Sequence, residues 1–519
     1  MELLKKNIHM MHEKNRYVSQ IMLDEDFNVP DSQPDVGHII QSSGAVKMDE
    51  VQTGTDKITI SGTLNTCVLY IADTPDRSVH RLDMKIPFQE YQNLEGASSG
   101  EKVHLKWELE DLTVSTINSR KLNLKAILNV TVFMQEVRDT VAAVEVHGMP
   151  EISVRTKTLE LLQPTVQKED IFRIKEEISV PSSKPNISKI LWENVQLRGA
   201  DIRVLDGQLD IKGELFVFVL YEGEDEKATK QWLETAVPFQ GVLECAGCSA
   251  DMISWVGVCL GENGLEAAKD YDGEPRLLSL EAVLSLDIRL YTEEQAEILE
   301  DVYSPAKELI PAREEQIYES LLMKNNSRLR ASQRLRLKGN QPRMLQTCSG
   351  RGEVKIDQTT VTKEGILVEG AVFVSILYVS SDDKVPYAVL EGAVMVEQLV
   401  EVPGITEDCR FDLQTGLEQL TVTMVDSEEV EVKVSVNLNI FAVQVHKNPC
   451  IVDVEEREMD LKKLQEMPGI VGYVVQPEDS LWSISKQYYT TPEKICELNQ
   501  IKEKDIQPGC KLILLKTVN

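Results

Sequence analysis

One block of sequence occurs three times along this chain, and that repetition restricts the possible folds more than any other feature. Each copy carries a glycine near its middle and ends in Leu-Tyr: residues 58–70, 209–221 and 366–378. The shared glycines are 151 and then 157 residues apart, at Gly62, Gly213 and Gly370. An upstream proline repeats with the same two spacings, at Pro34, Pro185 and Pro342. Because two landmarks shift together without a gap, the chain contains three copies of one module followed by a remainder.

Apolar residues within each copy recur at every second position. In the first copy they stand at 58, 60, 64, 68 and 70, and a later run alternates over 122–132, with equivalents at 278–288 and 430–440. Such alternation is typical of antiparallel strands with one face on a core. The shared glycine is predicted to mark a bulge or a close backbone approach. Pro87 and Pro238 predict edge strands, because proline cannot donate to a ladder.

Domain boundaries follow from the repeat. We expect a mainly β fold with three tandem antiparallel, sandwich-like modules and short helices, followed by a small α+β domain. The expected units are a first module with an N-terminal helical segment, a second module, a third module, a linker and a C-terminal domain: 1–147, 148–300, 301–446, 447–468 and 469–519. Three charged segments have helical character and could serve as packing helices or linkers: 1–22, 158–177 and 305–328.

The C-terminal domain has the pattern strand, helix, helix, strand. Residues 473–475 suit a short strand, and Asp479 or Ser480 is placed to cap a helix. Thr491-Pro492 begins a second helix, at a position where the missing proline N–H costs nothing. Asn499 is predicted to take the left-handed conformation that ends this helix. A closing strand at 512–514 completes the pattern.

Composition argues against several classes of function. The net charge of −30 repels nucleic-acid phosphate and anionic lipid, whereas a basic protein partner is compatible with it. No window holds the roughly 18 to 20 consecutive apolar residues of a transmembrane segment. Residues 1–15 lack the apolar core of a secretory signal. Nine scattered cysteines suit free thiols in a reducing compartment, so we expect a cytoplasmic protein.

Residues suited to catalysis or metal binding are sparse. None of the seven histidines lies in the second copy or the C-terminal domain, and no phosphate-binding loop, nucleophile elbow or HExxH helix is present. Cys245 and Cys248, with Cys259 nearby, are the best zinc candidates, but a tetrahedral site needs a fourth ligand. His9 and His12, one helical turn apart, are a weaker pair. We expect no enzyme activity, no metal and no cofactor.

The C-terminal segment resembles a LysM domain. The residues that carry the likeness are Tyr473, Val475, Asp479-Ser480-Leu481-Trp482, Ile484, Leu498-Asn499, Ile506, Pro508-Gly509 and Leu512. Members of this family usually bind N-acetylglucosamine polymers, in a shallow groove between the first strand–helix turn and the loop before the last strand. The resemblance places a partner-binding groove at Pro477, Glu478, Asp479, Ser480, Leu481, Trp482, Ile506, Gln507, Pro508 and Gly509. Glu478 replaces a glycine that commonly precedes the aspartate, which counts against glycan binding here.

Trp482 has two readings within this groove. It could brace the first helix from the core, or it could offer a broad, rigid apolar surface to a partner. Leu481, Ile484 and Tyr488 already define an inner face at helical spacing. Both readings stay open at this point.

The repeats, ending in this LysM-like domain, resemble a clostridial spore-coat family of the SipL type, whose module is called SPOCS. The residues that carry the likeness are the proline landmarks, the Gly to Leu-Tyr block and the last alternating strand. The resemblance implies a protein that acts without catalysis. It also implies a partner, the ATPase that polymerises as the basement layer of the coat. The LysM domain is then expected to dock on that ATPase, in the mother-cell cytoplasm at the forespore surface.

Two functions therefore stand side by side. The leading hypothesis is a spore-coat scaffold and tether, in which linked weak contacts gain through effective concentration. Other coat proteins are further candidate partners. The alternative is a glycan-binding protein of peptidoglycan or cortex, in which the repeats are spacers. Co-sedimentation with peptidoglycan separates the two hypotheses.

Overall fold

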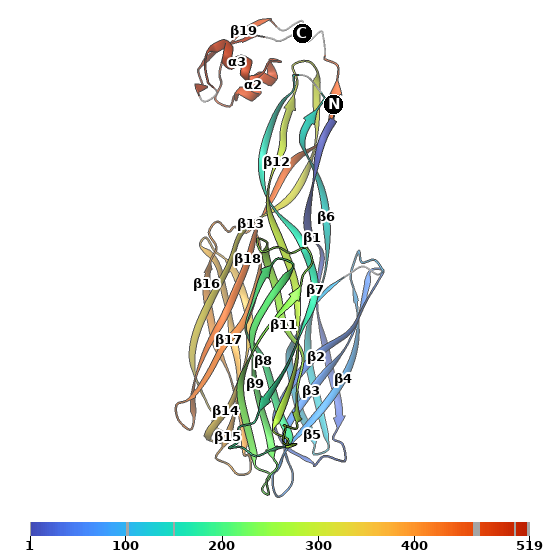
Figure 1. Cartoon of the computed structure of the whole chain (residues 1–519), viewed down its shortest axis with the longest axis vertical. Helices are drawn as coiled ribbons and strands as arrows, with labels where there is room; N and C mark the ends of the chain where they lie inside the picture. The colour runs from blue at the N-terminus through green and yellow to red at the C-terminus, as the bar shows by residue number, and fades with distance from the viewer. Residues whose placement is uncertain (1, 100–102, 149–150, 460–467, 503–504, 516–519) are drawn as a thin grey trace.

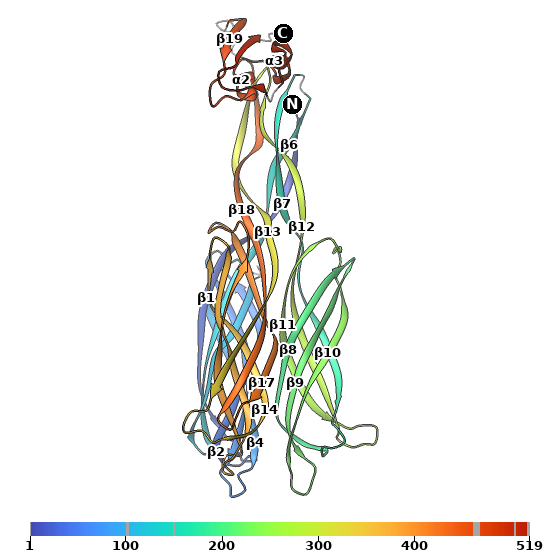
Figure 2. The same ribbon diagram turned by 90° about the vertical axis from the view of Figure 1, so that its left-hand side faces the viewer.

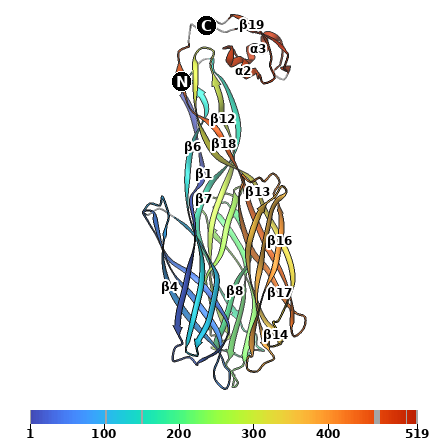
Figure 3. The same ribbon diagram turned by 180° about the vertical axis from the view of Figure 1, so that it is seen from behind.

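A computed structural model describes residues 2–99, 103–148, 151–459, 468–502 and 505–515, without the side chains of residues 11–15 and 135–137. The three repeats lie side by side as a broad head, and a narrower stalk of long strands rises from it (Figure 1). The C-terminal domain lies at the far end of this stalk, as the turned views also show (Figure 2 and Figure 3). The modules therefore form one elongated body, in which each repeat contributes to both head and stalk.

Each module is built from six strands in two antiparallel three-stranded sheets. In module 1 the sheets are β2-β3-β4 and β1-β6-β5. The strands are β1 (Glu2–Asn28), β2 (Val36–Gly54), β3 (Lys57–Ala72), β4 (Val79–Asn93), β5 (His104–Asn118) and β6 (Lys121–His147). The alternating apolar residues of β3 and β6 face each other in the core, which includes Leu64, Val68, Leu122 and Leu124. The expected sandwich-like β module is confirmed.

Modules 2 and 3 repeat the same strand order. Module 2 consists of β7 (Ser153–Ser179), β8 (Ile187–Leu205), β9 (Gln208–Gly223), β10 (Lys230–Glu244), β11 (Ile253–Ala268) and β12 (Leu277–Tyr303). Module 3 consists of β13 (Glu308–Arg336), β14 (Met344–Val361), β15 (Gly365–Ser380), β16 (Tyr387–Glu401), β17 (Arg410–Met424) and β18 (Glu429–Arg457). Their sheets are β10-β9-β8, β11-β12-β7, β14-β15-β16 and β13-β18-β17.

A hydrogen bond joins the two sequence landmarks of every repeat. The hydroxyls of Tyr70, Tyr221 and Tyr378 donate to the carbonyl oxygens of Pro34, Pro185 and Pro342, at 3.2, 3.2 and 3.0 Å. All three tyrosines are fully buried. Burial raises the pKa of Tyr70 to about 12. The bond ties the loop between the first two strands to the end of the third, which accounts for the constant spacing of the two landmarks.

The shared glycine allows a close approach between neighbours. A Cβ on Gly62 or Gly213 would lie 2.6 or 2.5 Å from the ring of Phe88 or Phe239. At Gly370 the obstacle is the Lys355 carbonyl of the neighbouring strand. The predicted close approach is confirmed. The pairing of the strands is also irregular here, but the shift in register lies on the strand that faces the glycine. In module 1 it falls between Met48 and Glu50, and it falls at equivalent places in the other two modules.

The two strand prolines lie on sheet edges, as the sequence predicted. Pro87 and Pro238 belong to β4 and β10, which are the outer strands of their sheets. An edge proline removes a donor from an open ladder and so discourages pairing with another chain. In module 3 the corresponding edge of β16 has no proline. There β13 covers it, and the Gln333 side-chain oxygen accepts from the Met395 N–H at 3.3 Å.

The three segments expected to be helices or linkers are strands. Residues 1–22, 158–177 and 305–328 fall largely within β1, β7 and β13, each of which pairs with the last strand of its module. In β7, Leu159 and Leu161 are buried and Glu160 between them is exposed. The charged residues that suggested a helix lie on the solvent face of a two-stranded ribbon. Here exposed and buried residues alternate one by one, which is the periodicity of a strand. The expected linker 447–468 is likewise strand as far as Arg457, and its residues 460–467 lie outside the described residues.

The stalk is formed by three ribbons, one from each module. They are the far halves of the β1/β6, β7/β12 and β13/β18 pairs (Figure 1 and Figure 2). Their shared core contains Ile8, Met10, Ala142, Leu159, Leu161, Ala296, Ile298, Tyr318 and Cys450, and next to it Ala143, Leu299, Val302, Leu309, Ile451 and Val454. An isolated two-stranded ribbon is marginally stable at best. Each ribbon of the stalk is therefore stabilised by packing against the ribbons of the other modules.

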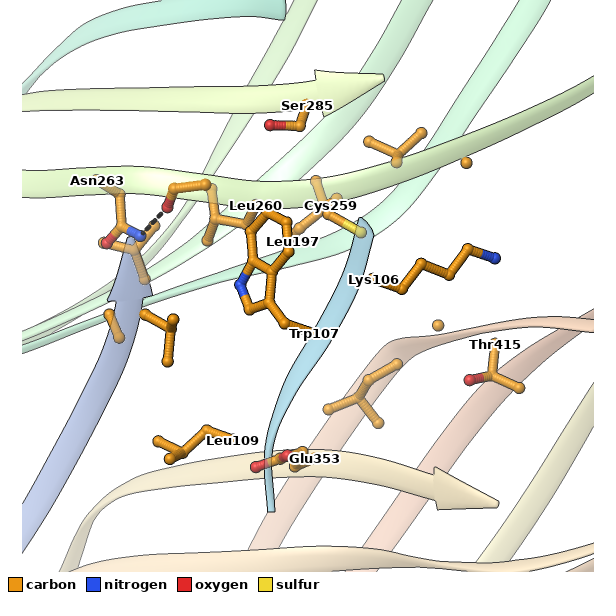
Figure 4. A pocket seen from close by; sticks show the side chains of 18 of the residues that line it. Lys106, Trp107, Leu109, Leu197, Cys259, Leu260, Asn263, Ser285, Glu353 and Thr415 are labelled. Atoms are coloured by element: carbon orange, nitrogen blue, oxygen red, sulfur yellow. Dashed lines mark hydrogen bonds between the residues drawn. The ribbon is translucent and has the colours of Figure 1, made fainter. Parts of the chain in front are cut away.

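The modules also meet within the head. One apolar cluster joins all three: Ile40, Leu69, Ile71, Val79, Leu191, Trp192, Phe216, Phe218, Leu220, Cys348, Leu377 and Tyr387. Ion pairs cross between modules, for example Arg81 with Glu193 at 3.2 Å. Between these contacts lies a hollow of about 2840 Å³ lined by all three modules. Figure 4 shows Lys106, Trp107, Cys259 and Thr415 among its lining residues.

Candidate functional site

The C-terminal domain has the expected order of strand, helix, helix and strand. Its elements are β19 (Ile470–Val474), α2 (Leu481–Gln487), α3 (Pro492–Asn499) and β20 (Lys511–Leu515). Ser480 caps α2 by accepting from the Ser483 N–H at 3.0 Å, and Thr491 caps α3. Gln500, with φ of 53°, takes the left-handed position that was expected at Asn499.

Asn499 is the last residue of α3, and its side chain forms hydrogen bonds with β20. Its amide oxygen accepts from the Ile513 N–H at 2.7 Å, and its amide nitrogen donates to the Ile513 carbonyl at 2.8 Å. These two bonds fasten the end of α3 to β20. The prediction for Asn499 was wrong because it considered only the local backbone preference.

The two loops of the predicted groove lie side by side. The Val475 N–H donates to the Cys510 carbonyl at 2.9 Å, and the Gly509 N–H donates to the Val475 carbonyl at 2.8 Å. The exposed members of the predicted site are Pro477, Glu478, Ser480, Gln507, Pro508 and Gly509. Ile506 is half-buried against the domain core. The fold thus brings these residues together on one end of the domain.

Asp479 shapes the first of these loops. Its carboxylate accepts from the Tyr473 hydroxyl at 2.6 Å and from the Gln476 N–H at 2.8 Å. These hydrogen bonds, with that of Tyr473 the larger, hold the pKa of Asp479 below its ordinary value. The same bond raises the pKa of Tyr473 to about 12. One oxygen of Asp479 is therefore committed to the fold of the loop.

Leu481 lies inside the domain. Its side chain is 5% exposed and packs in a core with Val475, Ile484, Ile495, Leu512 and Leu514. The side chain of Leu481 is therefore not accessible from the surface of the two loops.

Trp482 packs on the stalk of its own chain. Its indole N–H donates to the Asp301 carboxylate at 2.8 Å. The indole and the Tyr303 ring meet edge to face, with ring centres 4.9 Å apart and planes at 79°. The Arg155 guanidinium lies 5.6 Å from the centre of the indole ring. Neither reading of Trp482 from the sequence included this contact, because its partners are far away in the chain.

Asp301 is the centre of this contact between the C-terminal domain and the stalk. It is 8% exposed, and its carboxylate accepts from Lys486 at 2.8 Å and from Arg313 at 3.1 Å, besides Trp482. Burial alone raises the pKa of Asp301, but the hydrogen bonds from Lys486 and Trp482 and the Lys486 charge outweigh it, so the pKa lies below its ordinary value.

Two further bonds surround this centre. The buried hydroxyl of Tyr303 donates to the Thr490 carbonyl at 2.9 Å. Lys494 forms an ion pair with Glu151 at 3.5 Å. Both helical parts of the C-terminal domain are therefore attached to the same end of the stalk, near the tip of the β7/β12 ribbon (Figure 1).

The cysteine and histidine candidates are dispersed. Cys245 and Cys248 lie in the core of module 2, where the Cys248 thiol donates to the Leu205 carbonyl at 3.2 Å. Cys259 lines the central hollow instead. His9 is on a strand and contacts Asp139 at 2.7 Å, so the assumed helical turn to His12 does not exist, and the His12 side chain lies outside the described residues. Within the described part of the chain, no three His, Cys, Asp or Glu side chains form a metal site.

Fold and site together define a repeat protein with three β-sandwich modules that carry a small βααβ domain. Residues 35–117, 186–260 and 343–425 match the family model "SipL, SPOCS domain", and residues 473–514 match the LysM domain. The chain is a SipL-type protein with three SPOCS repeats and a C-terminal LysM domain. No curated protein and no solved structure matches the chain.

Two features of these matches bear on function. Neither matched family is an enzyme family. The three SPOCS matches begin at or just before β2, β8 and β14 and end within β5, β11 and at the end of β17. The long strands that build the stalk lie outside them.

Among the described residues, no helix combines the length and apolar character of a membrane span.

Proposed function

We propose that this protein is a non-enzymatic scaffold of spore-coat assembly that tethers the polymerising ATPase of the coat basement layer to the forespore surface. The family match supports an association with sporulation. The observation that carries the tether is structural: a small binding domain is held at the far end of a stalk to which all three modules contribute (Figure 1). This geometry suits presentation of one partner at a distance from the head.

The shared stalk core changes the expected role of the repeats. Separate modules on linkers would act as independent weak contacts, whereas these three modules share the stalk core and one cluster in the head. The three modules form a single support, so the length of the ribbons sets the distance between the head and the LysM domain. Other coat proteins are candidate partners for the head, and the mother-cell cytoplasm is the proposed location.

The partner face of the LysM domain is proposed to be the exposed part of its two loops. Glu478 and Gln507 are exposed on these adjacent loops. A double variant, Glu478→Arg with Gln507→Arg, changes the charge and size of one exposed side chain on each loop and leaves the core of the domain unaltered. We expect the full chain carrying it to bind the purified ATPase at least tenfold more weakly, measured by calorimetry. Glu497→Arg, an exposed change of the same kind on α3, is the matched control.

Equal affinity of the double variant and the wild type refutes this assignment of the partner face. A normal circular-dichroism spectrum and denaturation midpoint of the double variant are required, because a domain of about 45 residues has little stability to spare. Affinity purification from sporulating cells, with and without residues 469–519, tests the partner independently.

A glycan is the second candidate partner, since LysM domains commonly bind glycans. The same two loops form the groove in that case. Co-sedimentation of the full chain with peptidoglycan, abolished in the double variant, together with absence of ATPase binding, favours this alternative.

A further inference from the structure

The contact between the LysM domain and the stalk uses residues that only one of the three modules possesses. Arg155 and Asp301 face each other across the β7/β12 ribbon, and Tyr303 lies two residues further on. The pairs at the same position of the other ribbons are Leu4 with Glu145 and Ala312 with Asp453. The counterparts of Tyr303 are His147 and Glu455. Although the modules are copies, only module 2 has this combination of an arginine, a carboxylate and a tyrosine.

The chemistry of the contact depends on the LysM domain being present. The Asp301 carboxylate is almost completely buried, and a buried carboxylate requires hydrogen-bond donors. Two of its donors, Trp482 and Lys486, belong to the LysM domain, whereas Arg313 belongs to the stalk. Tryptophan, tyrosine and arginine are the residues that dominate binding hot spots. Trp482, in contact with both Tyr303 and Arg155, has this composition.

The position of Trp482 brings the contact close to the proposed partner face. Trp482 lies in the first turn of α2, which begins directly after the loop that carries Pro477 and Glu478. Trp482 itself is already in contact with Asp301 and Tyr303 of the stalk. A protein that covers this loop and continues along α2 to Trp482 must therefore displace the stalk from that side chain.

We propose that the tip of the β7/β12 ribbon is an intramolecular latch for the LysM domain, which competes with protein partners for the α2 face around Trp482. The partner in this statement rests on the proposed function, whereas the latch itself does not. Because a partner binds only the open fraction of molecules, its apparent affinity falls in proportion to that fraction. Opening the latch is thus a step at which capture of the partner is controlled.

Rotational motion of the LysM domain tests the latch without any partner. In the closed state the domain tumbles with the whole 58.5 kDa chain, so its amide NMR signals are broad. We expect Asp301→Ala in the full chain to release the domain and give a set of sharp amide signals. Lys486→Glu, on the LysM side of the contact, gives the same result if the latch is real, and it guards against misfolding of the stalk.

The repeat itself supplies the matched control. Asp453→Ala removes a carboxylate at the same position of module 3, where the side chain is exposed. We expect its LysM signals to stay as broad as those of the wild type. Sharp signals from the wild-type domain, or broad signals from both Asp301→Ala and Lys486→Glu, overturn the latch.

The affinity for the ATPase tests the competition. If the latch is closed in nine of ten molecules, Asp301→Ala raises the apparent affinity of the full chain about tenfold, with Asp453→Ala unchanged. An affinity of Asp301→Ala equal to or below that of the wild type overturns the competition. Absence of binding in every variant refutes the proposed function and the competition together, whereas the NMR result still decides whether the latch exists.

Discussion

The buried tyrosine of each repeat offers a sharp test of how the modules are held together. Tyr221→Phe removes one hydroxyl and keeps the ring, so no large cavity forms in the core of module 2. The change deletes the 3.2 Å bond to the Pro185 carbonyl and leaves that acceptor without this donor. The loss of a buried hydrogen bond of this type costs about 1–2 kcal/mol. We therefore expect the local opening equilibrium of module 2 to rise about 5- to 30-fold.

Native-state hydrogen exchange followed by mass spectrometry is the suitable assay, because it resolves the three modules within one chain. Peptides of β8 and β9 in Tyr221→Phe are expected to exchange faster by this factor. The same change at Tyr70 and Tyr378 is expected to act in modules 1 and 3, since the three tyrosines belong to different core clusters. Independent sites of this kind add, so the triple variant loses about 3–6 kcal/mol in total.

Tyr91→Phe is the matched control, because it removes the same hydroxyl from a side chain that is 69% exposed. Its effect on exchange is expected to be negligible. If Tyr221→Phe accelerates exchange no more than Tyr91→Phe does, the hydrogen bond between Tyr221 and Pro185 does not stabilise module 2. This bond then does not explain why the proline and the tyrosine recur in every module.

Three further predictions follow from other parts of the structure. Gly213→Ala is expected to cost about 1–3 kcal/mol, because the added Cβ meets the Phe239 ring, and a second change, Phe239→Leu, should restore part of the loss in a urea titration. Burial raises the pKa of Tyr70 from 10.0 to about 12 in the folded state. Its contribution to the stability of the folded state is therefore fully present below pH 10 and is lost as the pH rises toward 12, because the unfolded chain loses this proton first. The difference in absorbance at 295 nm between the wild type and Tyr70→Phe measures the titration of Tyr70. Burial raises the pKa of the Cys348 thiol to about 12, and at 6% exposure it should stay unreactive toward Ellman's reagent at pH 8 until the chain is unfolded. Reaction of the native Cys348 at the rate of a free thiol contradicts that burial.

Much of the module could be predicted because its signals are local. The alternation in 58–70 and 122–132 predicted strands β3 and β6, and Pro87 and Pro238 predicted edge strands, as observed. The LysM domain was also accessible, since its caps, turns and apolar spacing all lie within about 45 residues. The arrangement of its loops followed from the resemblance, and the helical spacing of Leu481 and Ile484 predicted that both face the core of the domain.

The failures concern contacts over long sequence distances. The segment 158–177 carries charges at spacings that are compatible with helix, and only its pairing with β12, more than 100 residues later, makes it a strand. Trp482 and Asp301 are 181 residues apart, so nothing near either residue indicates that they meet. Both landmarks of the repeat were visible, but the hydrogen bond between Pro185 and Tyr221 was not.

The amino-acid sequence alone establishes three copies of a β module and a LysM domain, because repetition, alternation and capping are properties of short stretches of chain. The union of the modules into one support depends on the tertiary structure. No single ribbon buries enough apolar surface to be stable by itself, and only the packing of all three creates the stalk core around Leu159, Ile298 and Cys450. The place of the LysM domain is decided at the same level, by a buried carboxylate whose hydrogen-bond donors come from two distant parts of the chain.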